Sequence, residues 1–336
     1  MTRMYTLLLA LAAAASLPAA RNLEIYSIDV EGGQATLIVT PAGETMLIDT
    51  GWSTPDHRDA ERIAAAAKAA GVHKIDYLVI THYHADHVGG VQDIAKKIPI
   101  VHFVDHGDQT EKGKQAEILF NEYSAFRAKG DHILAKPGET IPIKGLDVKV
   151  LSAAGQVIAA PLEGAGQPNP ACTGAARPPD DTTENGQSVG MLISYGQFRM
   201  IDLGDLTKDH EYDLMCPVNK IGLIDLYLVS HHGMPMSGSK VLLEGIDPHV
   251  ALMNNGPRKG GDAATWQTIR DTRNLLDIWQ LHYTMTADKQ HNAPDTFIAN
   301  IDEKCQGDWI KVTAEKDGTF TVLNSRNKYQ KTYTKK

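Results

Sequence analysis

The apolar positions of this chain gather in short runs that alternate with glycine, proline and polar residues, a pattern typical of a protein rich in strands. The first runs lie at residues 23–30, 34–40 and 44–49. The turns between them, at Gly32-Gly33 and Pro41-Ala42-Gly43, are short, so these runs predict an antiparallel meander. An alanine-rich amphipathic segment at 55–70 stops at Gly71 and predicts a helix.

The rest of the chain repeats this order of strands followed by helices. We expect strands at 75–80, 100–104, 140–143, 146–151, 188–195, 197–203, 223–230 and 250–254. We expect helices at 89–98, 113–128 and 263–273, a mixed apolar segment at 275–282, and a β-hairpin at 309–324 around Asp317-Gly318. Two such halves predict an α/β fold with two sheets face to face and helices outside, a four-layer αββα sandwich. We find no linker that would divide residues 21–336 into independent domains.

The segment 155–187 departs from the strand pattern because it is rich in Gly, Ala and Pro. It contains Gln167-Pro168-Asn169-Pro170 and Pro178-Pro179-Asp180-Asp181. A loop of this length inside a compact domain is usually a binding loop or lid, or else disordered. We interpret residues 155–187 as a loop over the active site.

Residues 1–20 have the composition of a secretory signal peptide. Arg3 supplies a positive start, residues 5–16 are apolar and alanine-rich, and small residues precede Arg21. The alternative is a buried N-terminal helix. The signal-peptide interpretation predicts a periplasmic or secreted protein with no membrane span after the signal is removed.

Composition narrows the range of functions. The 336 residues are 42% hydrophobic and 22% charged, with a formal net charge of -8, as in an ordinary globular protein. This charge argues against an extended nucleic-acid surface, so we expect a small-molecule substrate; the sequence does not indicate an oligomeric state. Export permits a disulfide, and Cys172, Cys216 and Cys305 allow one internal pair whose identity stays open.

The strongest chemical signal is the stretch Thr81-His82-Tyr83-His84-Ala85-Asp86-His87, which follows the apolar run 75–80. Imidazole is a good ligand for zinc and similar divalent ions, and carboxylate completes such ligand sets. His82 and His84 point the same way in extended backbone, whereas Asp86 and His87 lie at a corner between a strand and a helix. This spacing predicts two metal ions side by side, against the alternative of a histidine-rich exposed turn.

Other ligand-type residues also follow apolar runs. They are Asp49, Asp205 and His231, with His232 directly after it. Each alone is typical of a turn or of a packed side chain, but the recurrence of this placement favours one site built at strand ends. His282 and His291 come later and are either structural histidines or a substrate contact or general acid; His291 is favoured for the latter role because it lies in a polar loop.

The spacing His82-x-His84-x-Asp86-His87 resembles the HxHxDH motif of the metallo-β-lactamase superfamily. The stretch 47–51 is similar to the first motif of that superfamily, and Gly204-Asp205 is similar to its bridging-aspartate motif. A closer resemblance is to the hydrolase domain of bacterial DNA-uptake channel proteins and to secreted phosphorylcholine esterases. It is carried by residues 29–35, 188–193 and 229–233.

The resemblance implies a role for each matching residue. His82 and His84 would bind a first divalent ion, Asp86, His87 and His231 a second, Asp205 would bridge the two, and Asp49 would orient a ligand histidine. His232 is the alternative to His231. Residues 181–188 lack the further histidine of the superfamily, and we expect Asn185 in its place. The two ions would be zinc, with manganese as the alternative.

This ligand set predicts a metal-dependent hydrolase. A metal-bound hydroxide would attack the substrate, and Asp86 would also relay a proton. The missing histidine and the His231-His232-Gly233 motif favour, through the resemblance, a phosphodiester-type substrate. A lactone, ester or β-lactam substrate is the alternative, and a non-catalytic binding protein on the same scaffold is a third hypothesis.

Overall fold

The computed structural model describes residues 21–335, so the signal peptide expected at residues 1–20 lies outside the described residues. In the described part of the chain the strands form two sheets of nine strands each. The first sheet has the order β18-β17-β16-β1-β2-β3-β4-β5-β6. The second has the order β15-β14-β13-β12-β11-β10-β8-β7, with β9 paired to β8.

The bounds of these strands follow the expected apolar runs closely in the first half of the chain. The first sheet contains β1 (Leu23–Ser27), β2 (Thr36–Val39), β3 (Thr45–Ile48), β4 (Ile75–Val79), β5 (Ile100–Asp105), β6 (Asp131–Leu134), β16 (Ile310–Ala314), β17 (Phe320–Asn324) and β18 (Gln330–Tyr333). The second contains β7 (Thr140–Ile141), β8 (Asp147–Ala153), β9 (Gln156–Val157), β10 (Gly190–Tyr195), β11 (Phe198–Asp202), β12 (Leu226–Leu228), β13 (Val250–Met253), β14 (Asp277–His282) and β15 (Ile298–Asn300).

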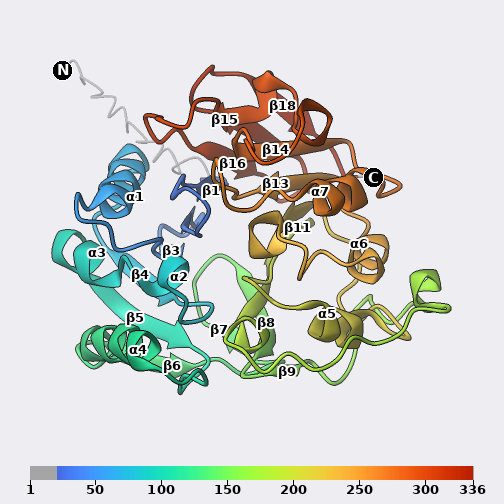
Figure 1. Cartoon of the computed structure of the whole chain (residues 1–336), viewed down its shortest axis with the longest axis horizontal. Coiled ribbons are helices and arrows are strands. Elements are labelled where there is room, and N and C mark those ends of the chain that lie inside the picture. Colours follow the sequence, from blue (N-terminus) through green and yellow to red (C-terminus); the bar gives the residue numbers. More distant parts are fainter. Residues whose placement is uncertain (1–20, 336) are drawn as a thin grey trace, which may run out of the picture.

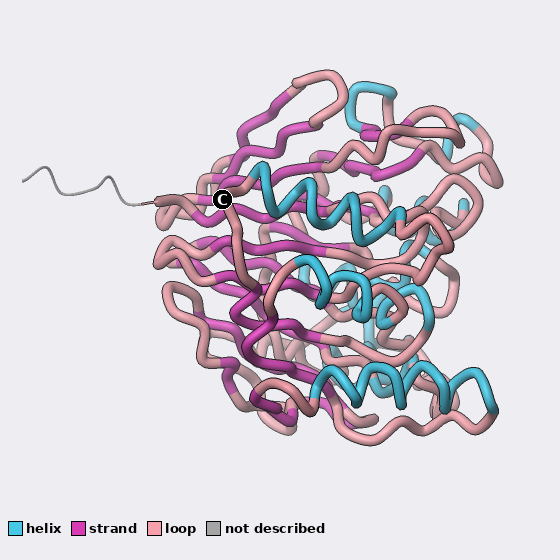
Figure 2. The backbone as a smooth tube through the Cα atoms, turned by 90° about the vertical axis from the view of Figure 1, so that its left-hand side faces the viewer, coloured by secondary structure: helices cyan, strands magenta, loops and turns pink. Residues whose placement is uncertain are grey.

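The helices cover the outer faces of the two sheets. They are α1 (Arg58–Ala69), α2 (Ala85–Val88), α3 (Val91–Lys97), α4 (Lys114–Arg127), α5 (Lys208–Met215), α6 (Lys240–Ile246) and α7 (Ala263–Arg270), with short 3-10 turns at Pro170–Cys172, Asn185–Gln187, Ser230–Gly233, Lys289–His291 and Asp295–Phe297. Figure 1 shows α1, α3 and α4 on one side of the molecule and α5, α6 and α7 on the other. In Figure 2 the strands run side by side with the helices alongside them.

Alternating side chains of the strands build three apolar layers. In β3, Ile48 belongs to the core between the two sheets, whereas Leu47 packs with Ile63 of α1. In β10, Ile193 faces the central core and Leu192 packs with the helices of the second half. Each fully buried side chain of this kind contributes about 1.5–3 kcal/mol of transfer free energy. The four-layer αββα sandwich expected from the sequence is confirmed.

Long-range pairing gives each sheet its final extent. The strands of the expected C-terminal hairpin, β16 and β17, are paired, and β16 lies antiparallel to β1, with Leu23 opposite Ala314. The meander β1-β2-β3 is antiparallel as expected. Strands β6, β15 and β18 and helices α5 and α6 were not expected from the hydrophobic pattern. The mixed apolar segment near 275–282 forms β14.

The segment 155–187 packs against the second half of the chain over much of its length. A disulfide joins Cys172 to Cys216, and the backbone N–H of Asp181 donates to Asp209 Oδ2 at 2.8 Å. Its C-terminal end reaches the histidine cluster, where Glu184 Oε2 accepts from the backbone N–H of Tyr83 at 3.2 Å. Within residues 21–335 no helix is both long and apolar enough to cross a membrane.

Candidate metal centre

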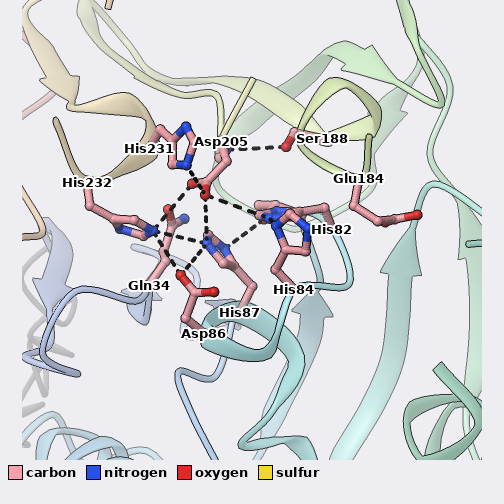
Figure 3. A network of polar contacts seen from close by, with 12 residues as sticks. Gln34, His82, His84, Asp86, His87, Glu184, Ser188, Asp205, His231 and His232 are labelled. Carbon is pink, nitrogen blue, oxygen red and sulfur yellow. Dashed lines mark hydrogen bonds and ion pairs between the residues drawn. The ribbon is translucent and has the colours of Figure 1, made fainter. Parts of the chain in front are cut away.

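Four strand ends meet at one place between the two sheets. Asp49 follows β3 and the His82–His87 stretch follows β4; Asp205 follows β11 and His231-His232 follows β12. Strands β3 and β4 are parallel, as are β11 and β12, so each pair ends at the same edge of its sheet. Packing the sheets face to face brings the two edges together, and Figure 3 shows the side chains converging.

Asp86, His87, Asp205 and His232 form the compact half of the site. Each offers a ligand atom, and these four atoms lie within 4.8 Å of one another in a fully buried group. Asp86 Oδ2 lies 3.2 Å from Nε2 of His232 and 3.4 Å from Nε2 of His87. Asp205 Oδ2 lies 3.3 Å from the same nitrogen of His87.

His82 and His84 form the other half. Nε2 of His82 lies 3.0 Å from Nδ1 of His84, and 3.8 Å from Oδ2 of Asp205. The Asp205 carboxylate therefore stands between the two halves, with His82 on one side and His87 on the other (Figure 3). This arrangement suits an oxygen donor shared by two ligand sets.

The buried carboxylates and imidazoles of the site shift one another's pKa values. Burial would raise the pKa of Asp205, but the neighbouring imidazoles of His87 and His232 outweigh it and hold the pKa well below its usual range. Burial would lower the pKa of His87, but the three carboxylates around it raise the pKa well above its usual value. His82 has no such surplus of carboxylates, so its burial lowers its pKa. Carboxylates this close together need positive charge beside them. Protonated imidazoles can supply that charge, and so can divalent ions.

Two of the candidate ligand histidines each have a carboxylate beside one ring nitrogen. Nδ1 of His87 lies 2.7 Å from Oδ2 of the buried Asp49, and Nε2 of His84 lies 3.0 Å from Oε1 of Glu111. Metal-binding histidines usually have a partner of this kind, which fixes the tautomer and the ring orientation. The role expected for Asp49 from the resemblance agrees with this contact, and Glu111 was not expected from the sequence.

The two adjacent histidines lie differently although both have left-handed backbone, with φ of 52° for His231 and 54° for His232. Nε2 of His232 faces both Asp86 and Asp205, at 3.2 Å and 3.5 Å. Nε2 of His231 lies 3.4 Å from Asp205, and burial lowers its pKa to about 4. His232 is therefore the better candidate for the compact half, and His231 borders it through Asp205.

Asn185 is buried in the short turn that closes the 155–187 segment. Its Oδ1 atom is buried and has no hydrogen-bond partner. Its neighbours Glu184 and Ser188 both touch the site, because Glu184 binds the backbone of Tyr83 and the Ser188 hydroxyl accepts from the backbone N–H of Asp205 at 3.2 Å. An unpaired carbonyl oxygen at this place agrees with Asn185 as a further oxygen donor.

The later histidines lie apart from this cluster. Nδ1 of His291 is 2.8 Å from Asp288 Oδ1, and its ring packs edge-on against Trp266, so its contacts give no support to a general-acid role. His282 is buried with Nε2 2.9 Å from Asp29 Oδ1, beside the thiol of Cys305. Arg62 already neutralises Asp29, at 2.7 Å. Asp29, His282 and Cys305 form a second group whose ligand atoms lie within 4.8 Å of one another, separate from the first group.

Lys259 also reaches the cluster and was not expected from the sequence. Its ammonium contacts Asp86 Oδ2 and lies 4.9 Å from the centroid of the Trp52 ring. In the sequence, the glycines around this lysine mark a tight loop, but they do not indicate a contact with the histidines. The loop reads Gly256-Pro257-Arg258-Lys259-Gly260-Gly261.

The donor set fits divalent metal ions. Imidazole nitrogens and carboxylate oxygens converge in a buried position, and Asp205 Oδ1 and Asn185 Oδ1 are buried without hydrogen-bond partners. Buried polar atoms normally have partners, and a buried oxygen that has no hydrogen bond is suited to a cation. His, Asp and Asn are the ligand types that Zn²⁺ and Mn²⁺ accept.

Residues 28–167 match the family model described as the metallo-beta-lactamase superfamily. This part of the chain is therefore similar to that superfamily. The matched region contains the HxHxDH stretch and Asp49, so the superfamily motifs identified in the sequence are confirmed in that part of the chain.

Two bacterial relatives share more of the chain. ComE operon protein 3 of Bacillus subtilis is 24% identical over 247 residues, which cover 69% of this chain and 28% of that protein. Recombination protein 2 of Haemophilus influenzae is 26% identical over 234 residues, which cover 69% of this chain and 24% of that protein. This chain thus spans about a quarter of the length of these relatives. Among solved structures, CmlA beta-hydroxylase (E377D mutant) has a TM-score of 0.48 and 14% identity, over 79% of this chain and 53% of that one.

Proposed function

We propose that this chain is an exported phosphodiesterase that uses two divalent ions, zinc or manganese. The observation that carries the proposal is the shared position of Asp205 between two sets of ligand atoms. His82 and His84 would hold one ion, with Asn185 as a further oxygen donor, and Asp86, His87 and His232 would hold the other. Paired ions in such a site stabilise the attacking and the leaving oxygen of a phosphoryl displacement and lower the pKa of bound water.

The protein residues prepare the site for that chemistry. Asp49 and Glu111 orient His87 and His84, so that the ring nitrogens on the far side point into the cluster. Burial excludes bulk water, which strengthens every electrostatic contact made with the substrate. Asp86 would bind the same ion as His87 and His232, and it would also relay a proton.

Export is supported by the disulfide between Cys172 and Cys216. Disulfides form and persist in oxidising compartments such as the periplasm and the cell exterior. This bond agrees with the signal-like composition of residues 1–20. The formal charge of -8 favours a small phosphodiester over a long nucleic acid.

A substrate panel tests the proposed reaction. Protein expressed without residues 1–20 is loaded with Zn²⁺ or Mn²⁺ and assayed with bis(p-nitrophenyl) phosphate, an aryl lactone and a chromogenic β-lactam. We expect turnover of the phosphodiester and its loss in Asp205→Ala, because this carboxylate serves both ligand sets. Turnover of the lactone or the β-lactam without the phosphodiester would assign the protein to the alternative substrate class. Full activity of Asp205→Ala would contradict the proposed site.

A further inference from the structure

Lys259 stands at the edge of the cluster on a loop that comes from neither histidine motif. Its ammonium contacts Asp86 Oδ2, its charge also acts on His231 and His232, and its side chain is 32% exposed. The ammonium lies 4.9 Å from the centroid of the Trp52 ring, a cation–π distance. This position makes it a charged group that faces both the cluster and solvent.

The loop around Lys259 is fixed by close backbone contacts. The backbone N–H of Gly256 donates to the Lys259 carbonyl at 2.8 Å, and the N–H of Gly261 donates to the His232 carbonyl at 2.9 Å. A side chain at Gly260 would stand 2.2 Å from that same carbonyl, and one at Gly32 would stand 2.7 Å from Cβ of Lys259. These contacts fix the backbone and the Cβ of Lys259, so the point from which its side chain reaches Asp86 is set by the fold.

Other cations near this edge are already neutralised. Arg58 pairs with Asp59 at 2.6 Å and with Glu31 at 2.5 Å, and Arg62 pairs with Asp29 at 2.7 Å. None of these partners belongs to the group formed by Asp86, His87, Asp205 and His232; Asp29 belongs to a separate group with His282 and Cys305. Lys259 differs, because its carboxylate partner Asp86 is also aimed at His87 and His232.

Asp86 is shared between Lys259 and the candidate metal ligands. If Asp86 held a divalent ion, its charge would no longer be available to the ammonium. The ammonium would then lie beside a cationic centre, where an anionic group would restore favourable electrostatics. A neutral ester or lactone offers no such charge, whereas a phosphodiester has one negative charge shared by two oxygens.

We propose that Lys259 binds the non-bridging oxygen of the substrate phosphate and selects anionic phosphodiesters over uncharged esters. This inference rests on the proposed phosphodiesterase function and adds the residue that determines the charge of the substrate. The ammonium also lies over the Trp52 ring, and the glycines of the loop let its backbone pass close to the His232 carbonyl.

Two substrates that share the p-nitrophenyl leaving group but differ in charge test whether Lys259 selects anionic phosphodiesters. The metal-loaded protein and the variants Lys259→Met and Lys259→Arg are assayed with anionic bis(p-nitrophenyl) phosphate and with uncharged diethyl p-nitrophenyl phosphate. We expect Lys259→Met to lower kcat/KM for the anionic diester by about 10–100-fold, the size of a lost charge-assisted hydrogen bond. Turnover of the neutral triester should change by less than about threefold, and Lys259→Arg should recover part of the diester activity. Equal losses on both substrates would overturn the inference.

A binding measurement separates this inference from the proposed function. Calorimetric titration of the metal-loaded protein with inorganic phosphate does not require turnover. Lys259→Met should weaken phosphate binding by about 10-fold or more with an unchanged number of bound metal ions per chain. Lys240→Met is the matched control, because Lys240 on α6 is exposed and pairs with Glu244; it should bind phosphate as the wild type does.

Each result of these two experiments has one meaning. Unchanged phosphate affinity in Lys259→Met would overturn the role of this lysine. Loss of bound metal in Lys259→Met would also overturn it, because the lysine would then support the metal ligands and not the substrate. A wild type that hydrolyses no phosphodiester but binds phosphate through Lys259 would contradict the proposed function and leave the anion site supported.

Discussion

Asp49 decides which ring nitrogen of His87 is free to bind a metal ion. Its Oδ2 lies 2.7 Å from Nδ1 of His87, and its Oδ1 accepts from the backbone N–H of Thr81 at 2.8 Å. An ionised carboxylate only accepts hydrogen bonds, so in the neutral ring, the form that can bind a metal ion, Nδ1 carries the proton and Nε2 keeps its lone pair. In Asp49→Asn the side-chain oxygen stays on Thr81, and the amide group faces Nδ1. That contact favours the tautomer with the proton on Nε2, the nitrogen aimed at Asp86 and Asp205.

The expected magnitude follows from the contact that is changed. Replacing the partner of a metal-binding histidine typically costs 10–100-fold in metal affinity, which corresponds to about 1.4–2.7 kcal/mol. We expect a loss in this range for Zn²⁺ in Asp49→Asn. The variant should fold, because asparagine has the shape of aspartate and Thr81 retains a hydrogen bond.

Competition against a chromophoric chelator measures this loss. Metal-free wild type and variant are titrated with Zn²⁺ at neutral pH, and urea unfolding without metal checks that the fold is intact. Asp76→Asn is the control: this buried carboxylate accepts from Thr45 at 2.9 Å at the start of β4, the end of the strand away from the histidines. Equal zinc affinity in Asp49→Asn and the wild type would refute the tautomer argument, and an equal loss in the Asp76→Asn control would show a non-specific effect of buried amides.

Three further predictions concern the adjacent histidines, the disulfide and a buried carboxyl. In the zinc titration, His232→Ala should lose more affinity than His231→Ala, since Nε2 of His232 faces two carboxylates; the reverse order would exchange their roles. Replacing both Cys172 and Cys216 by serine should lower the free energy of unfolding by about 4 kcal/mol, given their separation of 44 residues, with unchanged zinc stoichiometry; an unchanged urea midpoint would contradict this. Burial raises the pKa of Asp59 from 3.8 to about 6 despite its Arg58 partner, so the folded state binds more protons in that window. The free energy of unfolding should therefore fall as pH rises from about 4 to 6, by up to about 3 kcal/mol, and urea titrations should show a flatter profile for Asp59→Asn.

Local sequence patterns were sufficient for much of the fold. Strands such as Thr45–Ile48 are short apolar runs bounded by turns, and α1 is an amphipathic helix that ends near a glycine. Periodicity of this kind depends on neighbouring residues alone. It does not specify pairing between distant strands, which is why the antiparallel contact of β1 with β16 was not expected. Strand β6 was missed because it is largely exposed and has no apolar run.

The ligand motif was also readable from the sequence, because its spacing has a direct chemical meaning. His82, His84, Asp86 and His87 lie within six positions, and a strand followed by a helix directs them to one place. Asp49 and Asp205 were found by their positions at strand ends. Two further partners, Glu111 and Lys259, were not found, because the sequence of their loops does not indicate a contact with the site; the glycines around Lys259 mark only a tight loop.

By itself, the sequence indicated the resemblance to the superfamily, the layer order and most of the residues of the candidate metal centre. Only the tertiary structure decided how those residues are used. It separated His232 from His231, because two left-handed residues in succession aim neighbouring rings at different partners. It joined Cys172 to Cys216, and it left His291 with Asp288 and Trp266. It also brought Lys259 to Asp86 across 173 positions of the chain. Such contacts depend on how the two sheets and their loops pack, and this packing is set by the buried surface of the whole chain.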